Sequence, residues 1–537
     1  MTICLLLNSV KYKKVYSFQV FNVSEKFSYI NTPMLFHLDY FNLTFISLTV
    51  VIAMYVLPFV FRYMKHEPEI WRFYLLLNGF IASMILLLAS NTWWAILLGW
   101  ELIGWFSYFL INFFNPNKSV FKSSNKALIF NKLSDVGIYL FIISSLTLPI
   151  SGAAEYAGFW DFLNSTMVND KVSIKLVYLM LVGLLICAFC KSAQFGFYFW
   201  LPDSMEAPVP ASALIHSATL VSAGLYLIGR CQKVISFYSV FFYIVMIIGL
   251  VTAVIGAIVA CYQTDLKKTL AYSTISHCGV LMFLLTAPNL HYFLIYLVIH
   301  GIFKSFSFII AGDLIIFNHG YQDFRKLGGL IFKKKFLLGL FLFSLSGLSS
   351  LPFTIGFFSK YYFLNHGVLY SPQTSALFLF LLLIVGVASL VYFFRLIYYC
   401  FFGKTNSFIL TLLRNEVKKN YIIVPKQYFG SYELVYIFFL ILIAGYLALY
   451  LQIFMVFSNK YSGDSIDLLV EGWWIQIYSE LIKPYIQNYI FIFLFIILYI
   501  IMISWVLLYT KNPYISFILF YLLLFLIFVG MVFYIFF

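Results

Sequence analysis

The chain has 537 residues, of which 63% are hydrophobic and 10% are charged. A soluble domain carries about 45–50% apolar and about 25% charged residues, so a water-soluble fold could not cover this much apolar surface. We therefore expect an all-α integral membrane protein. The net charge of +14 favours basic loops that set membrane topology over a nucleic-acid footprint, and no nucleic-acid partner is predicted.

Apolar stretches of about 20 residues, enough for a helix to cross a bilayer, recur along the whole chain. Residues 1–36 precede them as a tail with no span and no clean signal-peptide pattern. The sequence predicts about 14 transmembrane helices, at residues 37–61, 71–90, 92–113, 126–149, 174–200, 211–229, 235–262, 268–288, 291–312, 336–364, 374–403, 431–457, 484–510 and 514–537.

Basic residues segregate when the connections are assigned alternately to the two sides of the membrane. One side receives most of them, among which are Lys267, Lys268, Arg325 and Lys326. The positive-inside tendency predicts that this side faces the matrix or cytoplasm, and that both termini lie on the opposite side.

Two predicted spans carry signals of a broken helix. The fifth span runs toward Pro202, which is followed by Pro208 and Pro210, and the tenth contains Pro352 shortly before Gly356. Proline removes a backbone donor, and non-helical backbone at membrane depth is tolerated only where protein or a wet cavity satisfies it. Discontinuous helices can indicate a transport path. A plain proline kink or a connecting loop would explain either signal alone.

Charged and titratable residues inside apolar spans are the main functional signal, because they are costly in hydrocarbon. His300 and Lys304 also share one helical face. A row of such groups can pass protons in single steps, whereas the alternative is a static ion-pair network. The candidate relay residues are Glu101, Lys191, His216, Lys304 and Lys360, with Asp135 and His300 in supporting roles.

The cysteines do not indicate a metal site. Cys187 and Cys190 share a helical face, but no second pair or nearby histidine completes a zinc site. We interpret them as small core residues. No nucleotide-binding loop or haem-attachment motif occurs, and no metal or cofactor is predicted in this chain.

The motifs around these residues resemble those of subunit 5 of respiratory complex I, an antiporter-like proton-pumping family. They are Gly99-Trp100-Glu101 with Ser107-Tyr108-Phe109-Leu110-Ile111, the stretch from Lys191 to Phe195, Trp200-Leu201-Pro202-Asp203 through Leu214-Ile215-His216, Asp265-Leu266-Lys267-Lys268, His300-x-x-x-Lys304 and Gly356-Phe357-Phe358-Ser359-Lys360. The match covers about residues 35–403.

The resemblance implies two inverted five-helix repeats, each with one broken helix. Residues 37–200 would form the first repeat, residues 201–403 the second with its flanking helices, and residues 404–537 a C-terminal extension of three spans. In the family, the acid at Glu101 pairs with the lysine at Lys191. The relay then runs by His216 to Lys304 and out by Lys360.

The resemblance also implies a proton-translocating subunit of NADH:ubiquinone oxidoreductase in the mitochondrial inner membrane, with the basic loops facing the matrix. FMN, iron–sulfur clusters and ubiquinone would lie in other subunits. The expected partners are membrane-arm subunits, especially a subunit 4-like neighbour, and phospholipids. The alternatives are a subunit of a multi-subunit cation/proton antiporter and a structural subunit that has lost transport.

Three features depart from the family pattern. The chain offers only about 36 residues before the span that begins near Asp39, where the family usually has two more spans, and only Lys511-Asn512-Pro513 stands where a long lateral helix is usual. Tyr296 occupies a position where bacterial relatives often carry a histidine. We expect a divergent, shortened subunit, with a separate polypeptide supplying the missing N-terminal helices.

Overall fold

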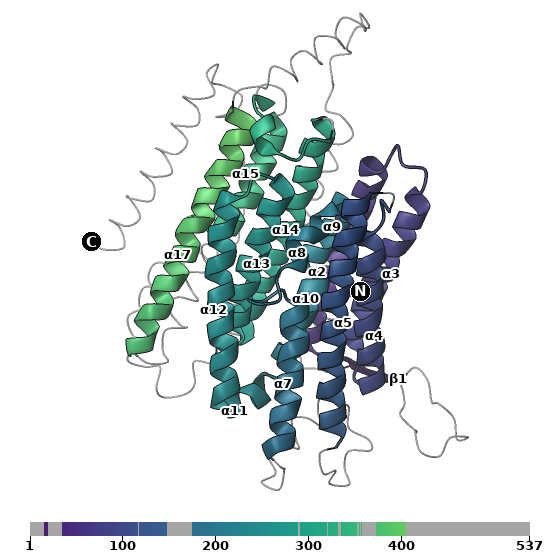
Figure 1. Ribbon diagram of the computed structural model, residues 1–537, viewed down its shortest axis with the longest axis vertical. Coiled ribbons are helices and arrows are strands. Elements are labelled where there is room, and N and C mark those ends of the chain that lie inside the picture. The colour runs from purple at the N-terminus through teal and green to yellow at the C-terminus, as the bar shows by residue number, and fades with distance from the viewer. Residues whose placement is uncertain are drawn as a thin grey trace, which may run out of the picture.

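The structure, a computed structural model, describes residues 16–19, 35–115, 117–147, 174–287, 290–318, 320–330, 335–351, 354, 356 and 372–403. In this part of the chain long helices lie side by side in one bundle (Figure 1). Eight helical segments there are long and apolar enough to cross a membrane. The expectation of a helical membrane fold is confirmed, while the total of 14 spans and the inverted repeats remain predictions.

The bundle begins with a feature that the all-α prediction did not include. Strand β1 (Tyr16–Gln19) pairs antiparallel with β2 (Leu35–Leu38), directly before the first described helix. The helices that follow are α2 (Tyr40–Tyr63), α3 (Ile70–Ala89), α4 (Trp93–Ile111) and α5 (Lys118–Leu146). Helix α5 begins eight residues before the predicted span at 126–149, because lysines at its start lower hydropathy without preventing a helix.

The second part of the bundle contains several interrupted helices. Its elements are α7 (Ile174–Lys191), α8 (Trp200–Asp203), the 3-10 turn η1 (Ser204–Glu206), α9 (Val209–Ser217), α10 (Leu220–Arg230), α11 (Gln232–Phe237), α12 (Ser239–Tyr262), α13 (Leu266–Leu284), α14 (Leu290–Phe317), the 3-10 turn η2 (Phe324–Lys326), α15 (Lys335–Ser349), α17 (Pro372–Ile397) and the π-helical turn η4 (Tyr398–Phe402). The predicted single span at 211–229 is therefore two helices, α9 and α10, and the predicted span at 174–200 ends at Lys191.

Burial separates the centre of the bundle from its rim. The apolar windows of α9–α10 and of α14 are entirely buried, whereas only a third of the window in α17 is buried. A helix that is apolar on all sides must be surrounded by protein or by lipid. The interrupted α9–α10 segment and α14 are thus at the centre, where any charged side chain is held away from lipid.

Helices α5 and α7 pack at backbone contact through two glycines. A Cβ atom at Gly137 would lie 2.6 Å from the backbone nitrogen of Cys187, and one at Gly183 would lie 2.7 Å from that of Phe141. Small residues allow this close approach between membrane helices. The contact fixes the end of α7, and with it Lys191, against α5.

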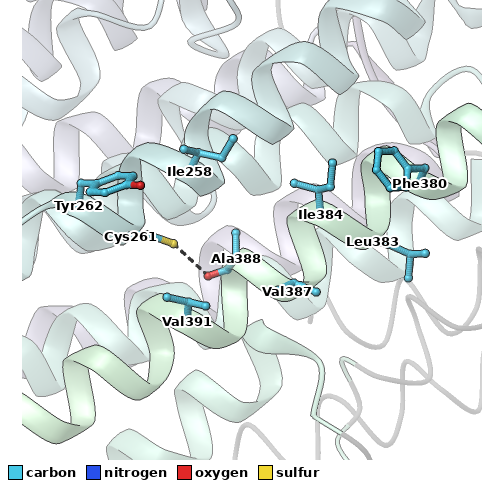
Figure 2. Close-up of a pocket in the computed structure, with 9 residues that line it drawn as sticks. All are labelled: Ile258, Cys261, Tyr262, Phe380, Leu383, Ile384, Val387, Ala388 and Val391. Atoms are coloured by element: carbon cyan, nitrogen blue, oxygen red, sulfur yellow. Dashed lines mark hydrogen bonds between the residues drawn. The ribbon is translucent and has the colours of Figure 1, made fainter.

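An apolar groove lies on the rim between α12 and α17. Figure 2 shows side chains of both helices along it, with the Cys261 thiol 3.4 Å from the Ala388 carbonyl oxygen. Its lining residues are Ile258, Cys261, Tyr262, Phe380, Leu383, Ile384, Val387, Ala388 and Val391. The lining holds no Lys, Arg, Asp, Glu or His, so the groove is separate from the charged residues considered below.

A bidentate ion pair connects the start of α2 with the end of α10. The Arg230 guanidinium donates to the two carboxylate oxygens of Asp39 at 2.6 and 2.8 Å, and it also donates to the Asn42 side-chain oxygen. Burial alone would raise the pKa of Asp39, but the hydrogen bonds and charge of Arg230 lower it below its ordinary value. The pair closes the bundle across a long sequence separation.

We predict that Asp39→Asn destabilises the bundle at neutral pH by about 3 kcal/mol, because it leaves a buried guanidinium without its counter-charge. Folding lowers the pKa of Asp39, so the contribution is complete above the pKa of about 3.9 of an unfolded aspartate and is lost as pH falls through the folded value. Thermal unfolding in detergent should therefore distinguish variant and parent at pH 7, with the difference shrinking in acid. The control is Glu69→Gln, which removes an exposed pair with Arg72 and should change stability by at most about 1 kcal/mol. Equal effects of the two variants at pH 7 would contradict the role given to Asp39.

Candidate functional site

Glu101, in the middle of α4, is bound by two residues of α5. Its carboxylate accepts from the Lys132 ammonium at 2.7 Å and from the Tyr139 hydroxyl at 2.9 Å, and Lys132 lies 3.0 Å from Asp135. Asp135 is buried, whereas the side chains of Glu101 and Lys132 are 25% and 44% exposed. These four residues, Glu101, Lys132, Tyr139 and Asp135, are called the acidic cluster below. The cluster therefore lies on the partly exposed face of α4 and α5.

Lys191, the last residue of α7, is fully buried. Its ammonium donates to the Trp100 carbonyl oxygen at 2.8 Å and lies 4.5 Å from the centre of the Trp100 ring. The carbonyl and the ring face each supply negative potential to the cation. Because Trp100 precedes Glu101, the Lys191 charge also interacts with those of Asp135 and Glu101.

The direct partner of Glu101 is thus Lys132, and the contact of Lys191 is the backbone beside Glu101. The resemblance implies that Glu101 pairs with Lys191, and it does not include Lys132, which lies within the predicted span at 126–149. Its three-residue spacing from Asp135 in an apolar helix was the signal that could have identified the pair.

The backbone that follows α7 is non-helical, and protein groups satisfy it. Ala193 and Gly196 have φ angles of +52° and +89°. The Trp200 indole donates to the Cys190 carbonyl at 3.0 Å, and the Gln194 side chain donates to the Ser192 carbonyl at 3.2 Å. The last carbonyls of a helix need such partners, above all where no water is present.

The three prolines of the motif lie on the return path into the bundle. Pro202 belongs to α8, Pro208 directly precedes α9, and Pro210 occupies its first turn, where a missing backbone donor costs nothing. The buried ammonium of Lys267 donates to the carbonyls of Met205 and Ala207 at 3.2 and 3.1 Å. Sequence reasoning placed Lys267 in a connection, whereas it is the second residue of α13 and binds the interrupted backbone.

His216 lies in the last turn of α9, wholly buried. Its Nε2 is 3.4 Å from the Ser204 hydroxyl, and its ring stacks on Phe308 of α14. Helix α9 ends one residue later, and the Thr219 hydroxyl donates to the Leu214 carbonyl at 2.8 Å across the gap before α10. His216 is close enough to Lys304 for their charges to interact.

Lys304 lies in the middle of α14 and is fully buried. Its ammonium donates to the Ser273 hydroxyl of α13, which also hydrogen-bonds Tyr392 of α17. His300, one turn earlier on α14, is buried as well, and its charge would interact with those of Lys304 and His216. Among the described residues, neither Lys191 nor Lys304 forms an ion pair within 4.0 Å.

Two predicted residues, Lys360 and Pro352, lie outside the described residues. Before them α15 ends at Ser349, and Ser350 has a φ of +59°. The Leu351 amide donates to the Ser346 carbonyl at 3.1 Å. The helix is therefore interrupted beside the predicted second break.

The described residues thus include several protonatable groups inside the bundle, namely the acidic cluster, Lys191, His216, Lys304 and His300. Burial disfavours a charged amine and a nearby carboxylate favours it, so small changes in separation can load or unload a proton. In the described part of the chain, no group of three His, Cys, Asp or Glu residues could hold a metal ion. The chemistry that these groups support is proton transfer.

Interrupted helices around buried lysines define an antiporter-like membrane bundle. The family model "NADH:quinone oxidoreductase/Mrp antiporter, TM" matches residues 90–386, which include all six described candidate residues. The chain belongs to this family.

Relatives and one solved structure agree with this assignment. Chain 5 of NADH-ubiquinone oxidoreductase from Paramecium tetraurelia is 43% identical over 382 residues, covering 69% of this chain and 65% of the relative. The chain 5 proteins of Patiria pectinifera and Sus scrofa are 33% and 30% identical, over 70% and 72% of this chain and 57% and 62% of theirs. The chain therefore spans somewhat less than two thirds of these relatives. The Mrp complex structure from Dietzia sp. DQ12-45-1b matches with a TM-score of 0.64 at 19% identity, over 94% of this chain and 58% of that one, so it shares the fold.

We predict that Gly224→Ala disturbs the end of α7, because a Cβ at Gly224 would overlap the Ala188 carbonyl oxygen and lie 3.1 Å from the Ser192 amide nitrogen. Overpacking of this kind costs about 1–3 kcal/mol, which should appear as a lower unfolding temperature in detergent. Gly386→Ala on α17 is the matched control, since no described atom outside its own stretch of helix lies within 4 Å of the added methyl group. The packing argument fails if both variants unfold at the parent temperature.

Proposed function

We propose that this chain is a proton-translocating membrane subunit of NADH:ubiquinone oxidoreductase. The observation that carries the proposal is the pair of buried amines, Lys191 and Lys304, whose hydrogen-bond acceptors among the described residues are a carbonyl and a hydroxyl. Ionisable residues in a membrane interior are costly and normally face a transport path. The names of the relatives support the identity of the complex.

In the proposed mechanism, a proton is loaded on Lys191 when the acidic cluster approaches it and is released when the cluster turns away. Lys132 provides the switch, because its ammonium competes with Lys191 for Glu101 and Asp135. The proton then passes by His216 to Lys304. Exit by Lys360 completes the route, as the family resemblance implies.

The energy for this transfer would come from other subunits. FMN, iron–sulfur clusters and ubiquinone are expected there, and this chain would hold no redox centre. The ion pair between Glu101 and Lys132 is partly exposed on α4 and α5, and contact with lipid would raise its free-energy cost. We therefore propose that a neighbouring membrane-arm subunit, of the subunit 4-like kind, covers Glu101 and Lys132.

The proposed location is the mitochondrial inner membrane, with the basic loops in the matrix and both termini on the intermembrane-space side. Phospholipid chains would contact the apolar rim, including the groove between α12 and α17 (Figure 2). In this proposal residues 37–200 form the first repeat, residues 201–403 form the second repeat with its flanking helices, and residues 404–537 form the C-terminal extension.

We predict that Lys191→Ala and Lys304→Ala each abolish most NADH-driven proton pumping in membrane vesicles, because the amine that carries the proton is removed. Native gels should show that the complex still assembles. Lys175→Ala, at the exposed start of α7, is the matched control and should pump normally. An unchanged proton-to-electron ratio in both relay variants would refute the route.

A second prediction concerns the acidic cluster. Glu101→Gln and Lys132→Met should each slow pumping, and the double variant should be no slower than the worse single variant, because both remove the same switch. The measurement is the initial pumping rate of the four forms in a double-mutant cycle. Multiplying defects would show that the two residues act independently, contrary to the proposed competition.

The alternative is a subunit of a multi-subunit cation/proton antiporter, which the shared fold of the Mrp complex favours. The two functions differ in their partners. Mass analysis of the native complex should find this chain beside flavin- and iron–sulfur-carrying subunits in the first case, and beside further membrane subunits alone in the second. Transport sensitive to a quinone-site inhibitor also supports the first.

A further inference from the structure

Two buried residues outside the proposed relay make a close contact beside it. On α13, His277 Nδ1 lies 2.6 Å from the hydroxyl oxygen of Tyr296 on α14, and the two residues are only 3% and 4% exposed. The His277 ring centre is also 5.2 Å from that of His300. His277 therefore lies within reach of two protonatable groups on the facing helix.

His300 has buried polar atoms that hydrophobic packing alone does not explain. Both of its ring nitrogens are buried and have no hydrogen-bond partner among the described residues. A buried polar group without a partner is costly, and proteins usually satisfy it with ordered water. In the centre of an apolar bundle, two such nitrogens mark a place where a proton or a water is accepted.

The spacing arranges these groups in two facing rows. Tyr296, His300 and Lys304 follow each other at four-residue intervals on α14, and Ser273 and His277 do so on α13. Residues four apart share a helix face, and the row on α14 spans about 12 Å along the axis. Each row contacts the other, through Lys304–Ser273 and through Tyr296–His277.

We propose that His277 and Tyr296 form a proton-carrying branch that leads from Lys304 and His300 toward the Leu290 end of α14. The inference rests on the proposed function. Lys304 gives its proton to the His300 imidazole, which passes it to the His277 ring. His277 accepts this proton on one nitrogen and releases one from Nδ1 to the Tyr296 oxygen, while the hydroxyl proton of Tyr296 leaves to water. After the step His277 carries its proton on the other nitrogen, and it returns to its starting tautomer when the ring turns over; Lys304 is restored when it is protonated again.

A purely structural hydrogen bond between α13 and α14 is the competing explanation, and the choice of variants separates the two. His277→Gln keeps a side chain that can hydrogen-bond the Tyr296 hydroxyl but cannot be protonated at neutral pH. Tyr296→Phe keeps the ring and removes only the hydroxyl. Tyr226→Phe, on α10, is the matched control for loss of a buried hydroxyl, and His291→Gln is the control for loss of an imidazole.

The experiment measures NADH-driven proton pumping by the assembled complex in vesicles, together with assembly on native gels. We expect His277→Gln and Tyr296→Phe each to lower the pumping rate by about tenfold with assembly retained, which is less than the loss of about a hundredfold or more for a sole proton-transfer group, because the exit by Lys360 stays open. The controls should pump at the parent rate.

Three outcomes would overturn the branch or its foundation. Normal pumping by both test variants, with Lys304→Ala inactive, overturns the branch and leaves the proposed function standing. Normal pumping by His277→Gln, with His277→Ala defective, assigns His277 a hydrogen-bonding role only and also overturns the branch. Normal pumping by Lys304→Ala removes the proposed function itself.

Discussion

The free-energy cost of holding an amine in an apolar interior is the constraint on which the rest of the structure depends. Lys191 and Lys304 are both fully buried, and neither contacts a described carboxylate. Charge in such a place is tolerated only if neighbouring dipoles replace water. The Trp100 carbonyl and ring and the Ser273 hydroxyl supply dipoles of this kind, and they bind an amine more weakly than a carboxylate would. A weakly held proton can move.

The interrupted helices follow from the same constraint. Ending α7 at Lys191 brings the ammonium to the backbone of α4, but it also leaves carbonyls without helical partners. The Trp200 indole and the Gln194 amide bind carbonyls at the end of α7, and the Lys267 ammonium of α13 binds the carbonyls of Met205 and Ala207 before α9. The broken backbone and the polar side chains therefore depend on each other, because these side chains satisfy carbonyls that the interrupted helices leave free.

Sequence reasoning identified residues whose signal is local and missed those whose role depends on tertiary contacts. Glu101, Lys191 and Lys304 are visible because a charge inside an apolar stretch is rare. Which acid meets which base depends on how α4, α5 and α7 are rotated about their axes, and sequence spacing does not determine that rotation. The break between α9 and α10 also escaped prediction, because Ser217, Ala218 and Thr219 include neither proline nor glycine. A hydroxyl contact to the Leu214 carbonyl stabilises it.

The two amines are not equivalent stores of a proton. Lys191 is the last residue of α7, where the carbonyl end of the helix dipole favours a positive charge, and the acidic cluster lies nearby. Lys304 lies in the middle of α14, where the dipole contributes little, and His216 and His300 would repel its charge when protonated. In the proposed mechanism, transfer from Lys191 to Lys304 would therefore begin with movement of the acidic cluster away from Lys191. The Glu101–Lys132 pair is charged and partly exposed, so in the proposed mechanism it is the part of the cluster on which a neighbouring subunit would act.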